Sequence, residues 1–374
     1  MSHAHDLSSS DLAAVAQAFL LHGHFISGAP YGSGHINDTY AVIFDQAGTR
    51  VRYILQRINH NVFRDVPALM ENIARVTSHA AKRLAAEAHP DASRRALTLV
   101  PTRDGRPYHR DAAERWWRCY LFVEKGRTYD IIERPSQAAE AARAFGAFQH
   151  LLVDLPGARL HETIPGFHHT RQRFERLRQA ATADAHGRAA AAKDDIAFAF
   201  QRENMVDQLL DLQARGELPE RITHNDTKLN NVILDDATQA AVCVIDLDTV
   251  MPGLAPYDFG DMMRTATNSA AEDETDLSKV QMRLPIFEAL VTGYLESAGA
   301  FLNATERASL VFGGMLMTYE VGIRFLTDYL AGDVYFKIKR PHHNLDRARN
   351  QFALLRQMEQ HRPAMEAFVR QARP

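Results

Sequence analysis

Residues 224–231 place a carboxylate, a cation and an amide within one short stretch, and another carboxylate, Asp246, follows an apolar run soon after it. Phosphoryl transfer passes through a loose, charge-rich transition state, so an enzyme mainly has to position the reactants and stabilise their charge. In that chemistry Asp226 is suited to orient an attacking hydroxyl and accept its proton, and Lys228 to neutralise the transferred group. Asn231 and Asp246 offer the oxygen atoms that Mg²⁺ prefers.

Each of these residues also has an ordinary structural explanation when it is taken alone. A His-x-Asp sequence is common in turns and helix caps, Asn231 could be a turn residue with positive φ, and Asp246 could simply end a strand. The joint spacing favours the catalytic interpretation, because a predicted hairpin lies between Asn231 and Asp246. Such a hairpin would bring the loop and the strand end side by side.

The pattern H-x-D-x-x-x-x-N, followed by a strand that ends in Ile245-Asp246, resembles the catalytic and metal-binding loops shared by protein kinases and aminoglycoside phosphotransferases. Longer stretches resemble one branch of that superfamily, the N-acetylhexosamine 1-kinases, and the resemblance extends from about residue 28 to about residue 349. These stretches are His224-Asn-Asp-Thr-Lys-Leu-Asn-Asn231, Ile245-Asp-Leu-Asp-Thr-Val-Met-Pro-Gly253, Tyr257-Asp-Phe-Gly-Asp261 and Arg324-Phe-Leu-Thr-Asp-Tyr329.

The resemblance implies a protein-kinase-like fold of two lobes, with ATP as the phosphoryl donor and Mg²⁺ as the cofactor. It implies that Asp226 is the catalytic base and that Asn231 and Asp246 bind Mg²⁺. Asp248 is then a further candidate for the metal site. The remaining residues of the motifs would hold the catalytic loop in place; they are His224, Asp258 and Asp261.

A glycine-rich stretch, residues 28–35, precedes a predicted hairpin in the N-terminal part. Its glycines would let backbone N–H groups approach phosphates closely, which makes Gly32, Ser33 and Gly34 candidates for nucleotide binding. The chain lacks the G-x-x-x-x-G-K-[ST] pattern of a P-loop, and a plain glycine turn is the alternative interpretation.

Kinases carry a lysine on the third strand that binds the α- and β-phosphates and pairs with a glutamate on the next helix. The corresponding strand here, Tyr53-Ile-Leu-Gln-Arg-Ile58, contains no lysine. Arg57 is the first candidate for this role because arginine binds phosphate in a bidentate manner, and Gln56 is the second. Glu71 is the expected partner on the helix. An arginine on a solvated strand face is the alternative.

The strand that ends at residue 124 runs directly into Lys125-Gly126, where the resemblance implies the hinge between the two lobes. Phe122, Val123 and Glu124 are therefore expected to contact the adenine. A buried central strand that ends at a domain boundary would show the same pattern.

The acceptor molecule is expected in the C-terminal part, facing the catalytic loop. Asn225 and Asn230 flank the proposed base, and His168, Arg324 and Tyr329 are further candidates for hydrogen bonds to a sugar. Sugar sites discriminate through many paired donors and acceptors, because leaving one unpaired is costly. Arg324 and Tyr329 could equally hold helices together.

Two groups of elements must position these residues. In the N-terminal part, hydrophobic periodicity predicts an antiparallel sheet with helices; the strands are expected at 39–44, 51–58, 97–102 and 115–123, and the helices at 11–22 and 66–88. After residue 126 helices dominate, apart from one short hairpin; they are expected at 136–153, 170–182, 188–214, 284–298, 305–331 and 344–371. We predict an α+β, protein-kinase-like fold with a nucleotide-binding lobe at 1–124 and a helical lobe at 125–374.

The bulk composition narrows the class of protein. The chain has 374 residues, of which 46% are hydrophobic and 24% charged, as in soluble globular proteins. Its formal net charge of -3 leaves no basic excess for nucleic acid or an anionic membrane. Two cysteines in apolar runs, Cys119 and Cys243, favour a cytoplasmic protein. No signal peptide is expected, and the apolar run 310–317 is too short to span a bilayer.

The predicted function is ATP- and Mg²⁺-dependent phosphorylation of a small molecule, at the anomeric hydroxyl of an N-acetylhexosamine or a related sugar. A second hypothesis changes the acceptor to an aminoglycoside, a choline-like alcohol or another metabolite. Cationic acceptors need an acidic pocket, and the density of Asp and Glu around 160–180 and 315–335 is modest. A catalytically silent nucleotide-binding module is the third hypothesis, but it predicts loss of the base or of a metal ligand.

Overall fold

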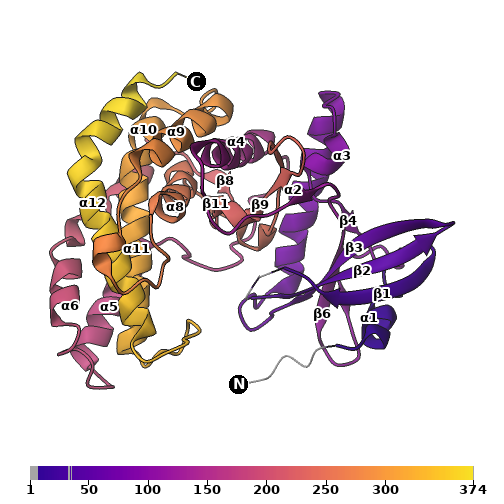
Figure 1. Cartoon of the computed structure of the whole chain (residues 1–374), viewed down its shortest axis with the longest axis horizontal. Coiled ribbons are helices and arrows are strands. Elements are labelled where there is room, and N and C mark those ends of the chain that lie inside the picture. The colour runs from indigo at the N-terminus through magenta and orange to yellow at the C-terminus, as the bar shows by residue number, and fades with distance from the viewer. Residues whose placement is uncertain (1–6, 33, 35, 374) are drawn as a thin grey trace.

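The computed structural model describes residues 7–32, 34 and 36–373. An antiparallel sheet lies at one end of the molecule and a body of helices at the other, and the catalytic segment, residues 224–249, lies between them (Figure 1). The strands of the sheet, in spatial order, are β1 (His24–Pro30), β2 (Asp38–Gln46), β3 (Thr49–Ile58), β6 (Trp116–Leu121) and β4 (Leu99–Val100), with β5 (His109–Arg110) also paired to β6.

The two faces of this sheet have different partners. Successive residues of a strand point to opposite faces, so Leu55 and Trp117 share the face that packs on α1 (Ser9–Ala16). Ile58 and Tyr120 point to the other face, and they belong to the large hydrophobic core that continues into the helical body. This second face is therefore the one that meets the catalytic segment.

Helix α2 (Val66–Ala86) is capped by Asp65, whose side chain accepts a hydrogen bond from the N–H of Ala68. It is anchored to the helical body, because the side-chain amide of the fully buried Asn72 donates to the carbonyl oxygens of His161 (2.8 Å) and Val250 (3.1 Å). Its apolar face, including Ile73, is part of the same core as the C-terminal helices. A short helix, α3 (Ala92–Arg95), follows.

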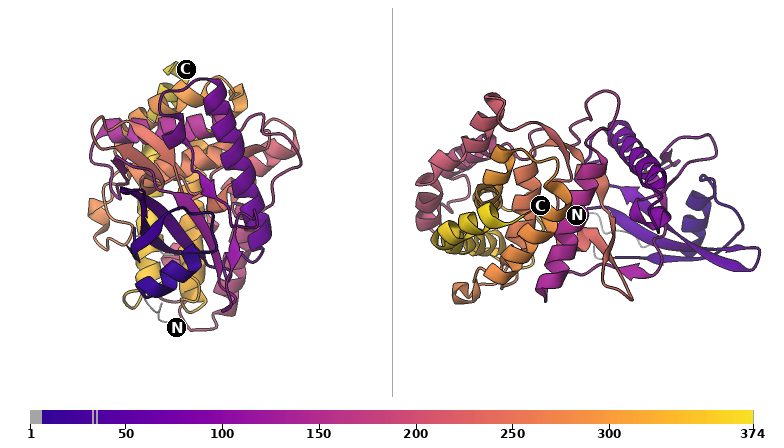
Figure 2. Two further views of the ribbon diagram at one scale, coloured as in Figure 1. Left: turned by 90° about the vertical axis from the view of Figure 1, so that its right-hand side faces the viewer. Right: turned by 90° about the horizontal axis from the view of Figure 1, so that it is seen from above.

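The helical body includes two small sheets, which lie on its side nearer the N-terminal sheet (Figure 1 and Figure 2). Its helices are α4 (Pro135–Leu151), α5 (Thr170–Ala183), α6 (Lys193–Phe200), α7 (Gln208–Ala214), α8 (Ala255–Thr267), α9 (Leu284–Ala298), α10 (Ala304–Ala308), α11 (Leu310–Leu330) and α12 (His343–Gln371). The sheets are β10 (Ala241–Val244) with β9 (Val232–Asp235) and β7 (Gly126–Arg127), and β11 (Met251–Gly253) with β8 (Arg221–Thr223).

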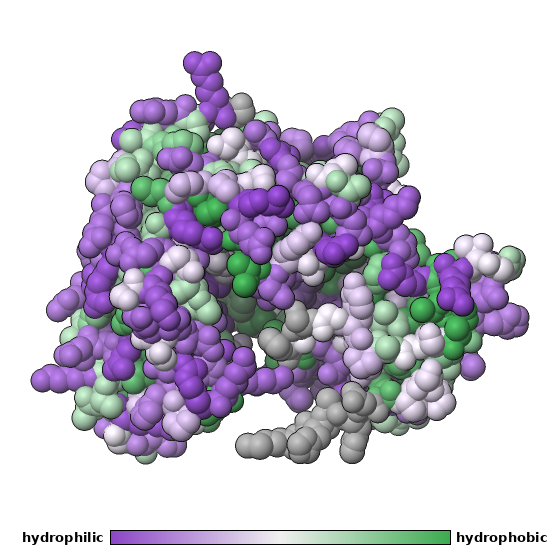
Figure 3. All heavy atoms as spheres, viewed as in Figure 1, coloured by the Kyte–Doolittle hydropathy of each residue, from purple (hydrophilic) through white to green (hydrophobic). Residues whose placement is uncertain are grey.

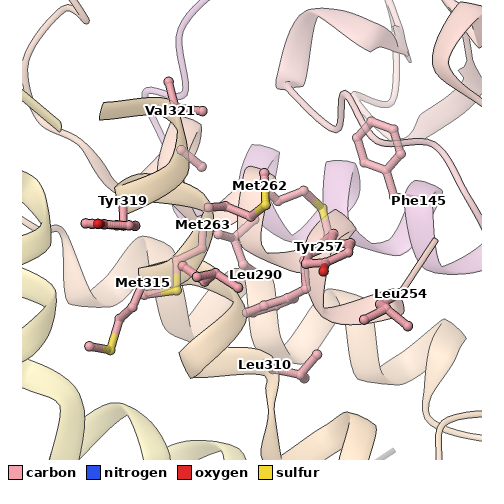
Figure 4. Close-up of a cluster of buried hydrophobic side chains, with 14 of the residues drawn as sticks. Phe145, Leu254, Tyr257, Met262, Met263, Leu290, Leu310, Met315, Tyr319 and Val321 are labelled. Atoms are coloured by element: carbon pink, nitrogen blue, oxygen red, sulfur yellow. The ribbon is translucent and has the colours of Figure 1, made fainter. Parts of the chain in front are cut away.

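Buried side chains of α8 and α11 form the centre of this body, with Tyr257, Met263 and Met315 among them (Figure 4). The two helices approach so closely that a Cβ atom on Gly260 would lie 2.4 Å from the carbonyl oxygen of Gly313. Such contact requires glycine, and it gives α8 a rigid backing. This matters because α8 carries residues that hold the catalytic loop.

The predicted α+β, kinase-like fold is confirmed, including the β2–β3 hairpin and the β9–β10 hairpin. The helix predicted at 11–22 ends at Ala16, because Phe19 pairs with Thr102 and the chain then enters β1, which the sequence analysis missed. The helix predicted at 188–214 is broken by a 3₁₀ turn at Glu203–Met205. The division at residues 124 and 125 stays a prediction.

Helix α11 is, among the described residues, the one helix long and apolar enough by length and composition to cross a membrane. The apolar run noted at 310–317 is thus the beginning of a 21-residue helix. In this structure 89% of the most apolar 18-residue stretch of α11 is buried by the surrounding protein, as in the core helix of a folded domain.

Candidate active site

The catalytic loop follows β8 and is held by the N-terminal half of α8. The fully buried carboxylate of Asp258 accepts hydrogen bonds from the backbone N–H of His224 (2.8 Å) and of Asn225 (2.7 Å). Asp261 accepts from the N–H of Thr227 (3.0 Å). The loop thus receives its shape from α8, which confirms the expected bracing by both aspartates.

The β9–β10 hairpin brings the catalytic loop to the strand end that carries Asp246. Ile245 donates its N–H to the carbonyl oxygen of Asn231 (2.9 Å), and its own carbonyl oxygen lies 2.9 Å from the Nε2 atom of His224. His224 is completely buried and has a structural role, as expected. Asn231 and Asp246 are therefore close neighbours across the hairpin.

Asp226, Lys228 and Asn231 form one hydrogen-bonded group at the mouth of this loop. The Lys228 ammonium lies 2.9 Å from the Oδ2 atom of Asp226, and the side-chain amide of Asn231 donates to the same atom (3.1 Å). Burial acts to raise the pKa of Asp226, but the charge of Lys228 and the hydrogen bonds from Lys228 and Asn231 lower it on balance. The carboxylate is therefore ionised and suited to attract the proton of a hydroxyl group.

Asp246 lies in the left-handed region (φ 60°) directly before a short turn, Leu247–Thr249. Burial, and the negative charges of Asp248 and Asp226, raise the pKa of Asp246 to about 6. Carboxylates that crowd together in this way are an unfavourable arrangement unless a cation joins them.

The donor set at this position fits Mg²⁺. In the described residues no group of three His, Cys, Asp or Glu side chains is arranged to hold a metal ion. Mg²⁺ does not require such a group, since it usually binds through one or two protein oxygens together with substrate phosphates and water. Asp246 supplies a carboxylate, and Asn231, whose amide nitrogen faces Asp226, retains its amide oxygen.

Asp248, the further candidate for the metal site, is occupied by other partners. One of its carboxylate oxygens is paired with Arg118 of β6, and the other accepts a hydrogen bond from the side chain of Asn37. The ion pair is almost inaccessible, with side chains 1% (Arg118) and 4% (Asp248) exposed. Sequence reasoning did not identify Arg118, although it is the one charged residue between Trp116 and Leu121.

The predicted pair between Arg57 and Glu71 is wrong. Arg57 shares the α1 face of the sheet with Leu55, and its Nε atom donates to Asp38, directly opposite on β2 (2.8 Å). Glu71 lies 3.0 Å from His161. The alternation of side chains along β3 instead directs Gln56, the second candidate, toward the catalytic segment.

Around the predicted hinge, Phe122 and Glu124 are held by neighbouring arginines. The Arg52 guanidinium lies 3.8 Å from the centre of the Phe122 ring and also pairs with the Glu124 carboxylate. Arg94 donates to the carbonyl oxygen of Glu124 (2.8 Å). The carboxylate and the carbonyl oxygen of Glu124 thus already have internal partners. Val123 remains the better candidate for a backbone contact with adenine.

The glycine-rich stretch leads from β1 to β2 beside Phe122, whose ring is in edge contact with Tyr31. Gly32 has a positive φ (80°), a conformation that suits glycine, and a Cβ atom at Gly32 or Gly34 would meet only open space. Ser33 lies outside the described residues. Gly32 and Gly34 remain candidates for nucleotide binding.

The predicted acceptor residues do not gather in one place. Asn225 is buried, and its side-chain amide donates to the carbonyl oxygen of Thr249 (2.8 Å), so a contact with a substrate is not supported. The hydroxyl of Tyr329 pairs with His342 (2.9 Å) in a buried position. Asn230 donates to Asp130 (3.3 Å).

His168 contacts the catalytic loop, and Arg324 contacts Phe167, the residue next to His168. The buried His168 connects Glu320 (2.9 Å) to the carbonyl oxygen of Asn225 (3.2 Å), so it supports the loop rather than facing a ligand. Arg324 lies over the ring of Phe167, the neighbour of His168, at 5.4 Å. Of the five acceptor candidates, Arg324 keeps the strongest case.

We expect the replacement Asp258→Asn to destabilise the protein by about 3 kcal/mol, because an amide nitrogen would face an N–H donor in a fully buried position. Besides the catalytic loop, Asp258 also accepts from Gln149 (2.7 Å), so no rotation of the amide satisfies every donor. Urea unfolding measures the effect. The exposed carboxylate Asp236, replaced in the same way, is the matched control. An unchanged midpoint for Asp258→Asn would contradict this account of the loop.

A sheet joined to a helical body, with a braced Asp226 loop and the Asp246 turn between them, defines a two-lobed phosphotransferase. Residues 27–294 match the model of the phosphotransferase enzyme family (APH). The chain belongs to this family, and it is an enzyme of the kinase type.

Solved structures share the fold at low sequence identity. An aminoglycoside phosphotransferase from Alicyclobacillus acidocaldarius matches with a TM-score of 0.58 and 15% identity, over 99% of this chain and 97% of that chain. A choline kinase from Cryptosporidium parvum matches with a TM-score of 0.57 and 13% identity, over 96% and 97%. A spectinomycin phosphotransferase in complex with ADP and spectinomycin gives 0.52 and 10%, over 95% and 99%.

Proposed function

We propose that this kinase transfers the γ-phosphoryl group of ATP to the anomeric hydroxyl of an N-acetylhexosamine or a closely related sugar, with Mg²⁺ as cofactor. The donor is supported by the family, and by a structural neighbour that was crystallised with ADP. The sugar is supported by the motifs that resemble the N-acetylhexosamine 1-kinases and by the charge of the acceptor side, which is the observation that carries the proposal.

The catalytic loop supplies three functions in this reaction. Ionised Asp226 orients the acceptor hydroxyl and receives its proton, at the Oδ2 atom that Lys228 and Asn231 already stabilise. Lys228 balances negative charge as the phosphoryl group moves. Asn231 and Asp246 would hold Mg²⁺, which screens the charge of the donor phosphates when it is bound.

We expect the acceptor beside Phe167 and His168, of which His168 contacts the catalytic loop, and this side of the helical body carries positive charge. Arg324 has no carboxylate within ion-pair distance among the described residues, and it lies between the rings of Phe167 and Phe336. Arg173 donates to the carbonyl oxygen of Phe167 (2.8 Å), and burial together with the charge of Arg324 lowers its pKa to about 10. Two neighbouring arginines repel a cationic acceptor and can donate hydrogen bonds to the oxygens of a neutral one.

The nearest buried acid on that side, Glu320, offsets part of the charge of the two arginines, but its carboxylate has no free oxygen for an acceptor. Glu320 is completely buried, and its carboxylate oxygens bind the ring of His168 (2.9 Å) and the hydroxyl of Thr170 (2.6 Å). A choline-like or polyamine acceptor requires free negative charge to replace its lost hydration. The arrangement therefore favours a neutral sugar over the cationic alternatives.

A screen of purified protein with ATP, Mg²⁺ and free acceptors tests the proposal. We expect turnover with N-acetylhexosamines, and a ³¹P signal from a sugar 1-phosphate whose phosphorus is coupled to the anomeric proton. The panel should include the matched amino sugars without the acetyl group, choline, ethanolamine and an aminoglycoside. Turnover with the cationic amines alone would favour the second hypothesis, in which the acceptor is an aminoglycoside or a choline-like alcohol.

A further inference from the structure

Arg118 is a charged side chain buried inside the contact between the sheet and the catalytic segment. It lies on β6 directly opposite Gln56 of β3, and its Nε atom donates to the Oε1 atom of Gln56 (2.9 Å). Both residues lie on the face of the sheet that meets the helical body. Gln56 is the second candidate for the position of the kinase lysine, and the cation beside it comes from the neighbouring strand.

The guanidinium of Arg118 reaches from the sheet to the turn that follows Asp246. It pairs with one oxygen of Asp248, and Asn37, from the segment before β2, donates to the other oxygen. The backbone of Asp248 is held as well, because the hydroxyl of Thr163 donates to the carbonyl oxygen of Asp248 (2.8 Å). Asp248 is thus hydrogen-bonded to residues of the N-terminal sheet region, Arg118 and Asn37, and to Thr163 of the helical body.

This arrangement constrains the backbone two residues away from the proposed metal ligand. Asp246 has a positive φ, and the short turn after it, Leu247–Thr249, begins from that strained conformation. A turn of this kind keeps its orientation only if the surrounding contacts determine it. The ion pair supplies such a contact, and it also sets how close the sheet lies to Asp246.

A buried ion pair is a poor way to gain stability alone, because the loss of hydration offsets much of the attraction between the two charges. Residues that orient a metal ligand without touching the metal commonly change metal affinity when they are replaced. The position of the turn therefore explains the presence of Arg118 better than a gain in stability does.

We infer that Arg118 is a positioning residue: through Asp248 it holds the turn that presents Asp246 to Mg²⁺, and so joins the nucleotide-binding sheet to the metal site. In this role Asp248 is the ion-pair partner of Arg118 and not a metal ligand. The inference rests on the proposed Mg²⁺ site, and it adds a residue and a connection that the family match does not assign.

The experiment separates positioning from stability by removing the charges singly and together. Arg118→Gln and Asp248→Asn each leave one buried charge unpaired, so both should lower the melting temperature. The double variant Arg118→Gln/Asp248→Asn leaves no unpaired charge and should recover most of that loss. Even so, we expect its affinity for Mg-ADP to fall by at least about tenfold in calorimetric titrations. Its affinity for ADP with EDTA should stay within about threefold of the parent.

A matched control comes from the other face of the same sheet. The double variant Arg57→Gln/Asp38→Asn removes a partly exposed ion pair between β3 and β2 that lies on the α1 face of the sheet, away from the catalytic segment, and it should bind Mg-ADP like the parent. Parent-like Mg-ADP affinity in the Arg118/Asp248 double variant would overturn the inference.

Two further variants keep the test decisive. If the double variant does not fold, Arg118→Lys replaces it, since a lysine keeps the charge but cannot serve Gln56 and Asp248 in the same geometry. We then expect Mg-ADP affinity to fall about threefold or more, and parent-like affinity would again overturn the inference. Asp246→Asn should abolish the effect of Mg²⁺ on ADP binding. If it does not, the proposed metal site is wrong, which is a different failure.

Discussion

Replacing Asp226 by asparagine is expected to lower kcat by at least about two orders of magnitude while the fold stays intact. The amide has nearly the same shape, but it cannot accept the proton of the acceptor hydroxyl. The ion pair with Lys228 that is lost is partly exposed, with side chains 39% (Lys228) and 30% (Asp226) exposed, so its contribution to stability is small. Steady-state kinetics with saturating ATP and acceptor measures the loss.

Two controls accompany this measurement. The melting temperature of Asp226→Asn should stay close to that of the parent, and nucleotide affinity should be retained because the donor site is untouched. The variant Asp236→Asn, which alters an exposed carboxylate paired with Arg127, should keep full turnover. Undiminished kcat in Asp226→Asn would remove this residue from the role of base.

Replacing Asp246 by asparagine is expected to lower kcat/KM by about three orders of magnitude at moderate Mg²⁺. A bound metal ion typically contributes several kcal/mol of charge stabilisation in the transition state, and the proposed site has few other protein ligands. Titration of Mg²⁺ at fixed ATP should show a large increase in the concentration needed for half-maximal rate. A variant with unchanged Mg²⁺ dependence would show that the metal is held elsewhere.

The same replacement should affect the stability of the ligand-free protein in the opposite direction. Crowding and burial raise the pKa of Asp246 to about 6, so the folded protein binds a proton there that the unfolded chain has released. Stability from this group is therefore lost as the pH rises from about 4 through about 6. Asp246→Asn removes the repulsion, so its melting temperature should exceed that of the parent at pH 8, and the difference should disappear at pH 4.

The catalytic loop could be predicted because its information is local. The spacing from His224 to Asn231 and the hairpin that leads to Asp246 depend on a few neighbouring residues, and the structure brings these side chains together. The bracing by Asp258 could be anticipated for the same reason, since its motif follows directly. The overall fold class followed from the contrast between a smaller strand-rich N-terminal part and a larger helix-rich C-terminal part.

Assignments that depend on tertiary packing could not be made from one sequence. Arg57 and Gln56 are adjacent, and only the packing of α1 on the sheet determines which of them faces the catalytic segment. Asn225 looked available to a substrate, but its amide is used by the carbonyl oxygen of Thr249, a contact made across the fold. A lone arginine in an apolar strand was the available signal for Arg118.

The anchoring of α2 has a consequence for how such an enzyme can be controlled. In kinases that are switched on and off, the corresponding helix swings to make or break its pair with the strand lysine. Here Asn72 fastens the helix to the C-terminal body, and Arg75 adds a bond to the carbonyl oxygen of Ala158 (2.6 Å). We therefore expect α2 to stay fixed to the C-terminal body rather than to swing as a switch.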